Sequence, residues 1–167
     1  MIIGLLSDTH GKAAIAAQAV QILLAADARY LIHCGDVGEG VIESLARLPS
    51  AFVFGNNDFD RQRMATEAQL AGVKCLGDFG ELELAGKRIA VAHGDIAHYV
   101  NKVIDGAQHD YLFTGHTHLR HDLRVGTLRR INPGALHRAH PKTVATLDLS
   151  TDTLRWLEVD EGPVRRF

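Results

Sequence analysis

One apolar run of the sequence ends in a Gly-His-Thr-His motif that sets two imidazoles two residues apart. Residues 111–114 are apolar enough for a buried strand, and Gly115 then lets the backbone turn sharply. If the segment that follows is extended, His116 and His118 point to the same side, because side chains alternate along a strand. Two imidazoles directed at one point suggest a metal site, whereas two partly exposed loop histidines would give the same pattern.

Other potential ligands follow other apolar runs. They are Asp8 and His10 after residues 2–6, Asp36 after 30–34, Asn56 after 51–54 and His93 after 88–92. Ligands of open α/β sheets bind outside the carboxyl ends of the strands, so we expect these loops to converge on one pocket. Carboxylate, amide and imidazole ligands without thiolates suit Mn, Fe, Co, Ni or Zn better than a structural zinc site. The set is too large for one tetrahedral ion and sufficient for two ions that share a carboxylate.

The elements that would position these ligands follow one sequence pattern in the first half of the chain and another in the second half. In the first half, apolar runs alternate with helical patterns over residues 12–26, 41–48 and 61–70. This rhythm predicts parallel strands with right-handed crossovers. From residue 73 the pattern predicts a helix over residues 97–104 and three hairpins, which pair 81–84 with 88–92, 123–125 with 128–131, and 144–149 with 154–159. We expect a single domain over residues 1–167, with an exposed tail from Glu161.

Composition restricts the function further. The 167-residue chain is 46% hydrophobic and carries a net charge of -2 without a long basic run, so we expect a folded protein that binds neither a nucleic-acid polymer nor a membrane. Cys34 and Cys75 do not form a disulfide framework. The chain shows no signal peptide and no apolar stretch long enough to cross a bilayer, which favours a cytoplasmic location.

Taken together, these motifs resemble the five blocks of the calcineurin-like metallophosphoesterases. The blocks are Asp8-x-His10, Gly35-Asp36, Gly55-Asn56-x-Asp58, His93-Gly94 and Gly115-His116-Thr117-His118. In its length and its hairpin-rich second half, the chain is similar to the small bacterial and archaeal phosphodiesterases of that superfamily. The resemblance extends from Met1 to about Leu149. It implies an α/β fold of four layers, in which two mixed β-sheets lie face to face between helices.

The resemblance also implies the metal ligands and the reaction. Asp8, His10 and His118 would hold one divalent ion. Asn56, His93 and His116 would hold the other. Asp36 would bridge the two, and we assign catalysis to Asp36, Asn56 and His93. The implied reaction is hydrolysis of a small phosphodiester by hydroxide that two metals generate from water. Manganese is the expected metal, with Ni, Co, Fe or Zn as alternatives. Hairpin edges and the resemblance allow a homodimer or a homotetramer.

One position departs from the pattern of many relatives. Asn57 stands where they have a histidine that is thought to protonate the leaving group or hold the phosphate. Asparagine donates a hydrogen bond but cannot deliver a proton, so we expect phosphodiesterase activity with weak phosphomonoesterase activity at most. The role of Asp58 without that histidine stays open. Asn57 and Arg120 are assigned to substrate binding, and Lys12 is a further candidate for contact with the phosphate.

Two other readings compete. The first is a non-catalytic protein-binding scaffold on the same fold, as in the retromer subunit that resembles this family, although all of the primary ligand types are present here. The second is a metallo-β-lactamase-type hydrolase, because residues 116–121 superficially resemble its His-x-His-x-Asp-His block. Arg120 occupies the position of the required aspartate, which counts against this second reading.

Overall fold

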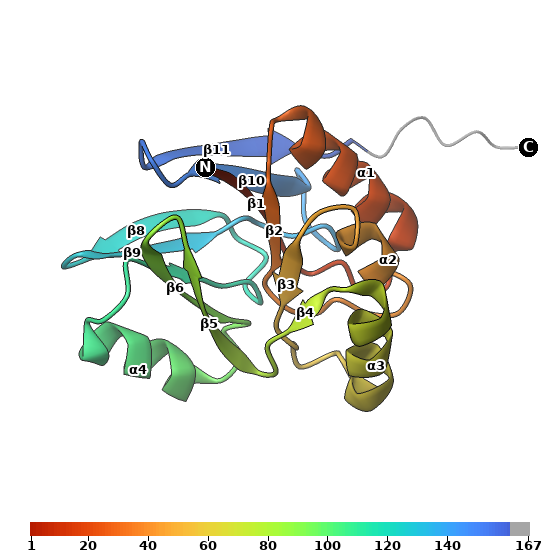
Figure 1. Cartoon of the computed structure of the whole chain (residues 1–167), viewed down its shortest axis with the longest axis horizontal. Coiled ribbons are helices and arrows are strands. Elements are labelled where there is room, and N and C mark those ends of the chain that lie inside the picture. The colour runs from red at the N-terminus through yellow and green to blue at the C-terminus, as the bar shows by residue number, and fades with distance from the viewer. Residues whose placement is uncertain (161–167) are drawn as a thin grey trace, which may run out of the picture.

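The computed structural model describes residues 1–160 and shows two β-sheets stacked face to face between helices (Figure 1). Helices α1, α2 and α3 cover the outer face of the first sheet, and α4 covers the outer face of the second. The helices are α1 (Ala13–Ala25), α2 (Ile42–Leu45), α3 (Arg61–Ala71) and α4 (Ala97–Gly106). The expected four-layer architecture is therefore confirmed.

The first sheet has the strand order β11-β10-β1-β2-β3-β4. Its strands are β1 (Ile2–Leu6), β2 (Tyr30–His33), β3 (Ser50–Phe52), β4 (Lys74–Cys75), β10 (Thr143–Asp148) and β11 (Thr153–Glu158). Strands β1 to β4 are parallel, as the β-loop-α rhythm predicted, whereas β10 and β11 join antiparallel. The carboxyl ends of β1, β2 and β3 consequently lie along one edge of the sheet.

The second sheet has the strand order β5-β6-β7-β9-β8. Its strands are β5 (Phe79–Leu84), β6 (Lys87–Ala92), β7 (Tyr111–Phe113), β8 (His121–Val125) and β9 (Leu128–Asn132). Strands β5 and β6 form one hairpin and β8 and β9 another, while β6, β7 and β9 run parallel. All three predicted hairpins are present, because β10 and β11 form the third.

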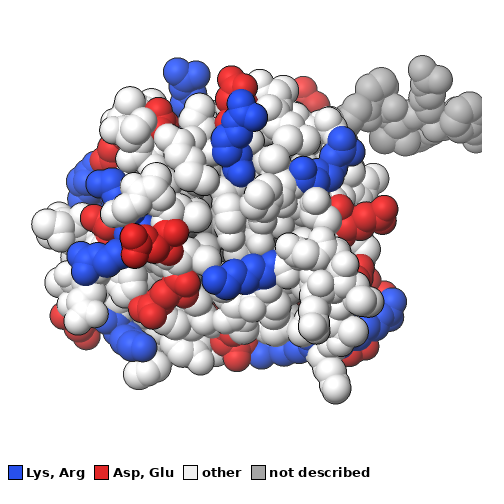
Figure 2. Space-filling view, viewed as in Figure 1, with Lys and Arg blue, Asp and Glu red and all other residues white. Residues whose placement is uncertain are grey.

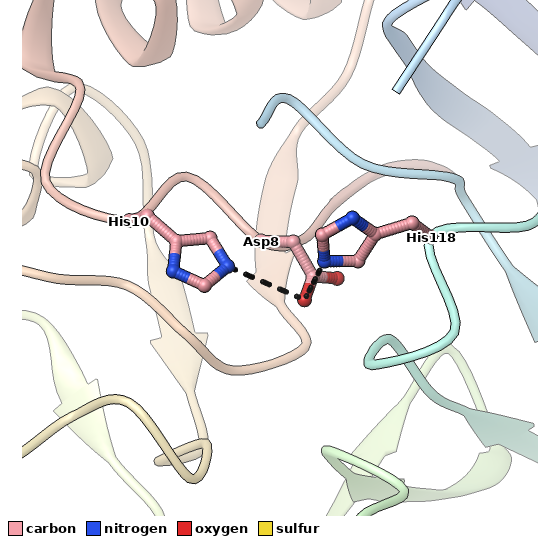
Figure 3. Close-up of side chains that lie close together, drawn as sticks. All are labelled: Asp8, His10 and His118. Atoms are coloured by element: carbon pink, nitrogen blue, oxygen red, sulfur yellow. Dashed lines mark ion pairs between the residues drawn. The ribbon is translucent and has the colours of Figure 1, made fainter. Parts of the chain in front are cut away.

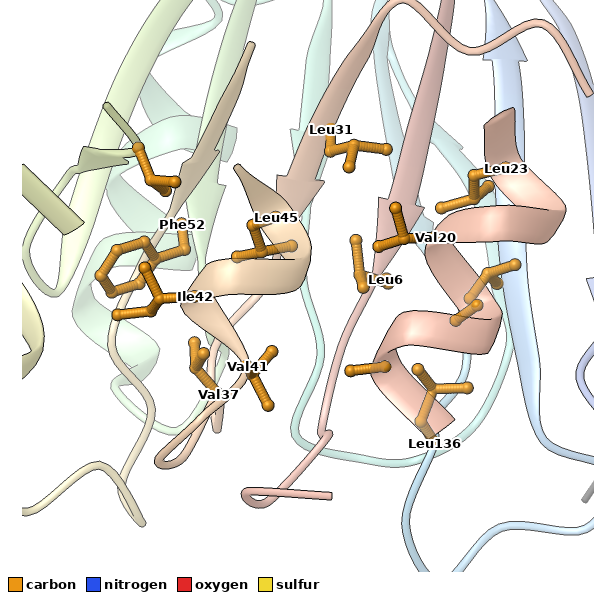
Figure 4. Packing of buried hydrophobic residues seen from close by; sticks show 14 of the residues in the cluster. Leu6, Val20, Leu23, Leu31, Val37, Val41, Ile42, Leu45, Phe52 and Leu136 are labelled. Atoms are coloured by element: carbon orange, nitrogen blue, oxygen red, sulfur yellow. The ribbon is translucent and has the colours of Figure 1, made fainter. Parts of the chain in front are cut away.

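Hydrophobic side chains fill the space between each pair of layers. Successive side chains of a strand point to opposite faces of the sheet, so neighbouring residues belong to different clusters. Leu31 packs with the cluster under α1 and α2, and Ile32 packs with the cluster between the sheets. Figure 4 shows Leu6, Leu31 and Phe52 against side chains of α1 and α2. A smaller cluster joins α4 to the second sheet. The sheets are thereby fixed against each other, which fixes the loops at their ends.

Two elements differ from the sequence prediction. Helix α2 is shorter than the expected 41–48, because it ends at Leu45 and the Leu48 N–H donates to the Leu45 carbonyl oxygen in a turn. Pro49, which disfavours a helical conformation of Leu48, follows this turn. Strand β4 was missed, since two residues are too few to show a periodicity. The expected tail from Glu161 lies outside the described residues.

The surface carries charges of both signs. On the face drawn in Figure 2, basic and acidic side chains are interspersed, in keeping with the small net charge of -2. None of the helices in residues 1–160 combines the length and the apolar character that crossing a bilayer requires.

Candidate metal centre

The loops that carry the predicted ligands meet where the two sheets adjoin. In the first sheet, Asp8 and His10 follow β1, Asp36 follows β2 and Asn56 lies beyond β3; in the second sheet, His93 follows β6, and His116 and His118 follow β7. The short distances given below show that all seven side chains gather in one place. The predicted convergence of these loops is therefore correct, and neither sheet supplies the set alone.

Asp8 lies among histidines from different loops (Figure 3). Its buried carboxylate has Oδ1 at 3.2 Å from Nε2 of His118 and at 4.0 Å from Nε2 of His10. The other oxygen, Oδ2, accepts hydrogen bonds from Ser7 Oγ at 2.6 Å and from the His116 backbone N–H at 3.2 Å. These two donors hold the carboxylate so that Oδ1 faces the imidazoles.

Asp36 lies between two histidines that belong to different predicted metal sites. Its Oδ2 is 3.4 Å from Nε2 of His10 and 3.3 Å from Nε2 of His93. The ligand atoms of Asp8, His10 and His118 lie within 4.8 Å of one another, and so do those of Asp8, Asp36 and His93. A carboxylate shared between two ions would need the position that Asp36 has.

The remaining predicted ligands lie beside His93. Nδ1 of His116 is 3.1 Å from Oδ1 of Asn56, and the ring centroids of His93 and His116 are 5.1 Å apart. His116 and Asn56 are exposed, whereas His93 is buried. The two histidines of the Gly-His-Thr-His motif thus face different neighbours, because His118 lies against Asp8.

The centre contains buried polar atoms without hydrogen-bond partners. Among the described residues these include Asp8 Oδ1, His10 Nε2 and His93 Nε2, which all face the same space. His93 donates from Nδ1 to the Cys34 carbonyl oxygen at 2.8 Å, so the lone pair of Nε2 is directed into the centre. An unpaired buried polar atom costs about 1–3 kcal/mol, and divalent cations would satisfy all three atoms. The residues present therefore fit metal ions.

Backbone conformation at the ligands corrects one expectation. Asp8, His10, Asp36, His116 and His118 have φ angles of 55°, 47°, 53°, 65° and 59°, in the left-handed region. The segments 8–10 and 116–118 are therefore not extended, and side-chain alternation does not explain where their ligands point. A left-handed conformation costs a residue with a side chain roughly 1–2 kcal/mol, and such strain concentrates at functional sites.

Burial and hydrogen bonding shift the pKa values of the two carboxyl groups in opposite directions. Burial raises the pKa of Asp8 above its ordinary value, and the Ser7 hydroxyl offsets this only in part. Burial also acts to raise the pKa of Asp36, but the adjacent His93 imidazole and the hydrogen bonds from Asn57 outweigh it and hold that pKa low. Asp36 is therefore ionised at neutral pH, and a cation would favour the ionised form of Asp8 as well.

Three supporting interactions were not predicted. Asp58 is buried and accepts hydrogen bonds from the backbone N–H groups of Val37, Gly38 and Gly55, at 3.1, 2.8 and 2.8 Å. It joins the Asp36 loop to the Asn56 turn, which gives this carboxylate a structural role without a histidine partner. No local sequence signal reveals the contact with the Asp36 loop, because two of the donors are backbone groups about twenty residues away.

The second interaction is a buried chain below the Asp36 loop. The Gly35 N–H donates to Nδ1 of His33 at 3.2 Å, so Nε2 carries the proton and donates to Thr9 Oγ1 at 2.8 Å. Thr9 in turn donates to the Val37 carbonyl oxygen at 2.7 Å. This places His33 beneath the ligand loops as a packed, hydrogen-bonded residue.

Asn132 provides the third interaction. Its Nδ2 donates to the Gly115 carbonyl oxygen at 2.8 Å and to Thr117 Oγ1 at 3.2 Å. It thereby holds the loop that carries His116 and His118. In the sequence, Asn132 was visible only as part of an Asn-Pro-Gly turn.

The predicted substrate-binding residues line two different hollows, each of which also includes predicted metal ligands. Asn57 lines a cavity of about 460 Å³ together with His10 and Asp36. Arg120 lines a groove of 700 Å³ together with His116 and His118. Lys12 is exposed and lies just before α1.

Comparison with known proteins agrees with this geometry. The sequence profile described as the calcineurin-like phosphoesterase superfamily domain matches residues 1–152. A phosphodiesterase of Methanocaldococcus jannaschii is 29% identical over 138 residues, which cover 80% of this chain and 83% of that protein. The structure of an archaeal phosphodiesterase superposes with a TM-score of 0.87 at 27% identity, covering 95% of this chain and 99% of the other.

More distant structures share the fold alone. The phosphoesterase YfcE of E. coli has a TM-score of 0.67 at 21% identity, covering 96% of this chain and 100% of that chain. Vps29 of Entamoeba histolytica in complex with zinc has a TM-score of 0.64 at 16% identity, again covering 96% and 100%. With the five ligand blocks, the four layers and the match over residues 1–152, the chain belongs to the calcineurin-like phosphoesterase superfamily.

Proposed function

We propose that this phosphoester hydrolase is a phosphodiesterase that binds two divalent metal ions and acts on small phosphodiesters. The observation that carries the proposal is the set of buried, unpartnered atoms of Asp8, His10 and His93 that face one space. The position of Asp36 Oδ2 between His10 and His93 supports a second ion beside the first. The related phosphodiesterase of Methanocaldococcus jannaschii supports diester substrates.

Each of the seven predicted ligands has a definite part in this proposal. Asp8, His10 and His118 hold one ion, Asn56, His93 and His116 hold the other, and Asp36 is shared. When bound, two such ions supply hydroxide near neutral pH and offset the negative charge of the phosphate oxygens. The Cys34 carbonyl oxygen fixes the tautomer of His93, and Ser7 fixes the orientation of Asp8.

The surroundings of the ions favour diesters over monoesters. Asn57 is exposed and donates to Asp36 Oδ2 at 2.8 Å, and its amide can orient a phosphate oxygen but cannot protonate a leaving group. Substrates whose leaving groups need little protonation should therefore react best, and phosphomonoesters weakly. Manganese is the proposed metal, and the interspersed surface charge supports a small substrate rather than a polymer (Figure 2).

Hydrolysis of bis-p-nitrophenyl phosphate tests the proposal. Metal-stripped protein should be inactive, and adding Mn²⁺ should restore the release of p-nitrophenolate. Asp36→Asn should abolish this activity while circular dichroism shows a folded protein. Asp27→Asn, which changes an exposed carboxylate that pairs with Arg29 and is not a predicted ligand, should stay active. Folded protein that stays inactive with Mn²⁺, Ni²⁺, Co²⁺ and Zn²⁺ would instead favour a protein-binding scaffold.

A further inference from the structure

We infer that the groove beside His118 is an anion subsite that takes a second phosphate group of the substrate. The inference rests on the proposed function, because the subsite adjoins the metal centre and would select among phosphodiesters. It adds a substrate class, namely diesters that carry another phosphate close to the reacting one. Three features of the groove support it: its lining, the way its arginines are held, and the contrast of its charge with that of the cavity next to Asn57.

The groove has cationic side chains and predicted metal ligands in the same wall. It has a volume of 700 Å³, and its lining includes His116, His118, Arg120, Arg138 and His140. A diester held at the metal centre would therefore have one of its two ester groups next to this groove. Guanidinium groups bind phosphate oxygens through paired N–H donors, which makes phosphate a better match than a neutral group.

Arg120 is held in place without a carboxylate. Its guanidinium lies over the ring of Trp156, 5.8 Å from the ring centroid. Trp156 donates from Nε1 to the Asn132 carbonyl oxygen at 3.4 Å, and the Asn132 side chain holds the loop of His116 and His118. Within residues 1–160, no carboxylate lies within ion-pair distance of Arg120, so its charge is available to a ligand.

Arg138 is held in a strained conformation close to the centre. Its φ angle is 47°, which costs a residue other than glycine roughly 1–2 kcal/mol and is uncommon for arginine. The preceding residue, His137, has its ring centroid 4.8 Å from that of His10. In the described part of the chain Arg138, too, is without an ion pair to an acidic group. The loop therefore presents a second unpaired guanidinium beside the same ligands.

The cavity next to Asn57 is acidic where the groove of Arg120 and Arg138 is basic. The 460 Å³ cavity next to Asn57 is lined by the acidic residues Glu39 and Asp60 and by Phe59, which is 86% exposed. The arginines nearby have carboxylate partners, since Arg63 pairs with Glu39 at 3.3 Å and Arg61 pairs with Asp78. An anionic substituent would be repelled there and attracted to the groove of Arg120 and Arg138. The charge difference thus orients the substrate.

Two substrates that differ only in one phosphate test the inference. They are thymidine 5′-(p-nitrophenyl phosphate) and the same compound with a 3′-phosphate, and both release p-nitrophenolate. With Mn²⁺-loaded protein we expect kcat/KM to be about tenfold higher for the compound with the 3′-phosphate, and this ratio should fall at high ionic strength. Arg138→Ala and Arg120→Ala should bring the ratio towards one, and Arg138→Glu should bring it below one.

Matched variants keep the result interpretable. Arg63→Ala removes an arginine on the acidic side and should leave the ratio as in the wild type. Arg138→Lys and Arg120→Lys preserve the charge and should keep part of the preference, even if an alanine variant does not fold. Metal-dependent hydrolysis with a wild-type ratio near one, or a ratio that both alanine substitutions leave unchanged, would overturn the anion subsite. Failure to hydrolyse either compound would instead count against the proposed function.

Discussion

Asn57 donates two hydrogen bonds to Asp36, from its backbone N–H to Oδ1 and from Nδ2 to Oδ2, and each is 2.8 Å long. The two carboxylate oxygens are thereby oriented from one side, while Oδ2 also faces His10 and His93. Asn57 supports the proposed bridging ligand, but its amide has no proton to transfer to a leaving group. This contact makes position 57 the natural place to test the preference for diesters.

Asn57→His should raise the hydrolysis of p-nitrophenyl phosphate relative to that of bis-p-nitrophenyl phosphate. An imidazole at this position could protonate the leaving group, and general acids of this kind contribute about 10²–10⁴-fold when well placed. We expect a gain of at least about tenfold in the ratio of the two rates. Asn57→Gln, which introduces no acid, serves as the control. Monoester rates that stay the same or fall in the histidine variant would count against the explanation.

Asp58→Ala should destabilise the protein more than an ordinary loss of a helix cap. The substitution leaves three backbone N–H groups at the junction of the Asp36 and Asn56 loops without an acceptor, which should lower the free energy of unfolding by about 3 kcal/mol. Asp60→Ala is the matched control, because Asp60 caps α3 through a single bond from the Arg63 N–H and should cost about 1 kcal/mol. Urea denaturation measures both, and equal losses would contradict the structural role of Asp58.

His33 should make the stability of the metal-stripped protein depend on pH. Burial lowers the pKa of His33 to about 3, against 6.5 for an unperturbed imidazole. Between these values the unfolded chain binds a proton at this residue and the folded chain does not. The free energy of unfolding should therefore fall as the pH drops below 6.5, with a contribution approaching about 1.4 kcal/mol per pH unit.

Urea denaturation at several pH values between 7 and 5 measures this effect. His33→Gln cannot take up the proton and should show a shallower loss of stability than the wild type. The exposed His98, changed to Gln, should leave the wild-type slope intact. The assignment to His33 would be wrong if the wild type and His33→Gln lost stability in parallel.

Gly115→Ala should weaken metal binding. A Cβ atom at this position would lie 1.9 Å from Ser7 Oγ and 2.8 Å from Asp8 Oδ2, so the Ser7–Asp8 contact would have to move. Disturbing groups that orient metal ligands typically costs 10–100-fold in affinity, and we expect a loss of that size for Mn²⁺. Isothermal titration calorimetry measures it. Gly106→Ala is the control, because a Cβ there would meet nothing within 4 Å; equal affinities in the two variants would refute the explanation.

The sequence was most informative where one physical cause dominates. The apolar run at residues 2–6 predicted β1 to the residue, because a strand covered on both faces has no polar positions. The ligand types at the strand ends predicted which side chains gather. The geometric reasoning for the two histidines was wrong, since the left-handed φ angles of His116 and His118 arise from the loop's tertiary contacts and leave no periodicity to read.

Residues that support the ligands were harder to predict for a different reason. Asp58 and Asn132 act largely on backbone groups that are distant in the sequence. Asp58 stands in the Gly-Asn-x-Asp block and Asn132 in an Asn-Pro-Gly turn, but neither pattern identifies these backbone partners. The end of α2 was also hard to predict. The apolar pattern of Val41, Leu45 and Leu48 continues to residue 48, whereas the helix ends at Leu45 and a turn leads to Pro49. The type of a side chain indicates which ligand or catalyst it could be. The backbone groups to which it bonds can be identified only once the chain is folded.

The division of the ligands between two sheets has a consequence for the order in which the protein matures. Asp8 and the backbone of His116 are in contact although 108 residues separate them along the chain. At translation rates of about 5–20 residues per second, roughly 5–20 s pass between the synthesis of these two residues. Late in that interval a nascent chain would have Asp8, His10, Asp36, Asn56 and His93 but neither histidine of the loop after β7. Completion of the centre is thus a late event in the biogenesis of the enzyme.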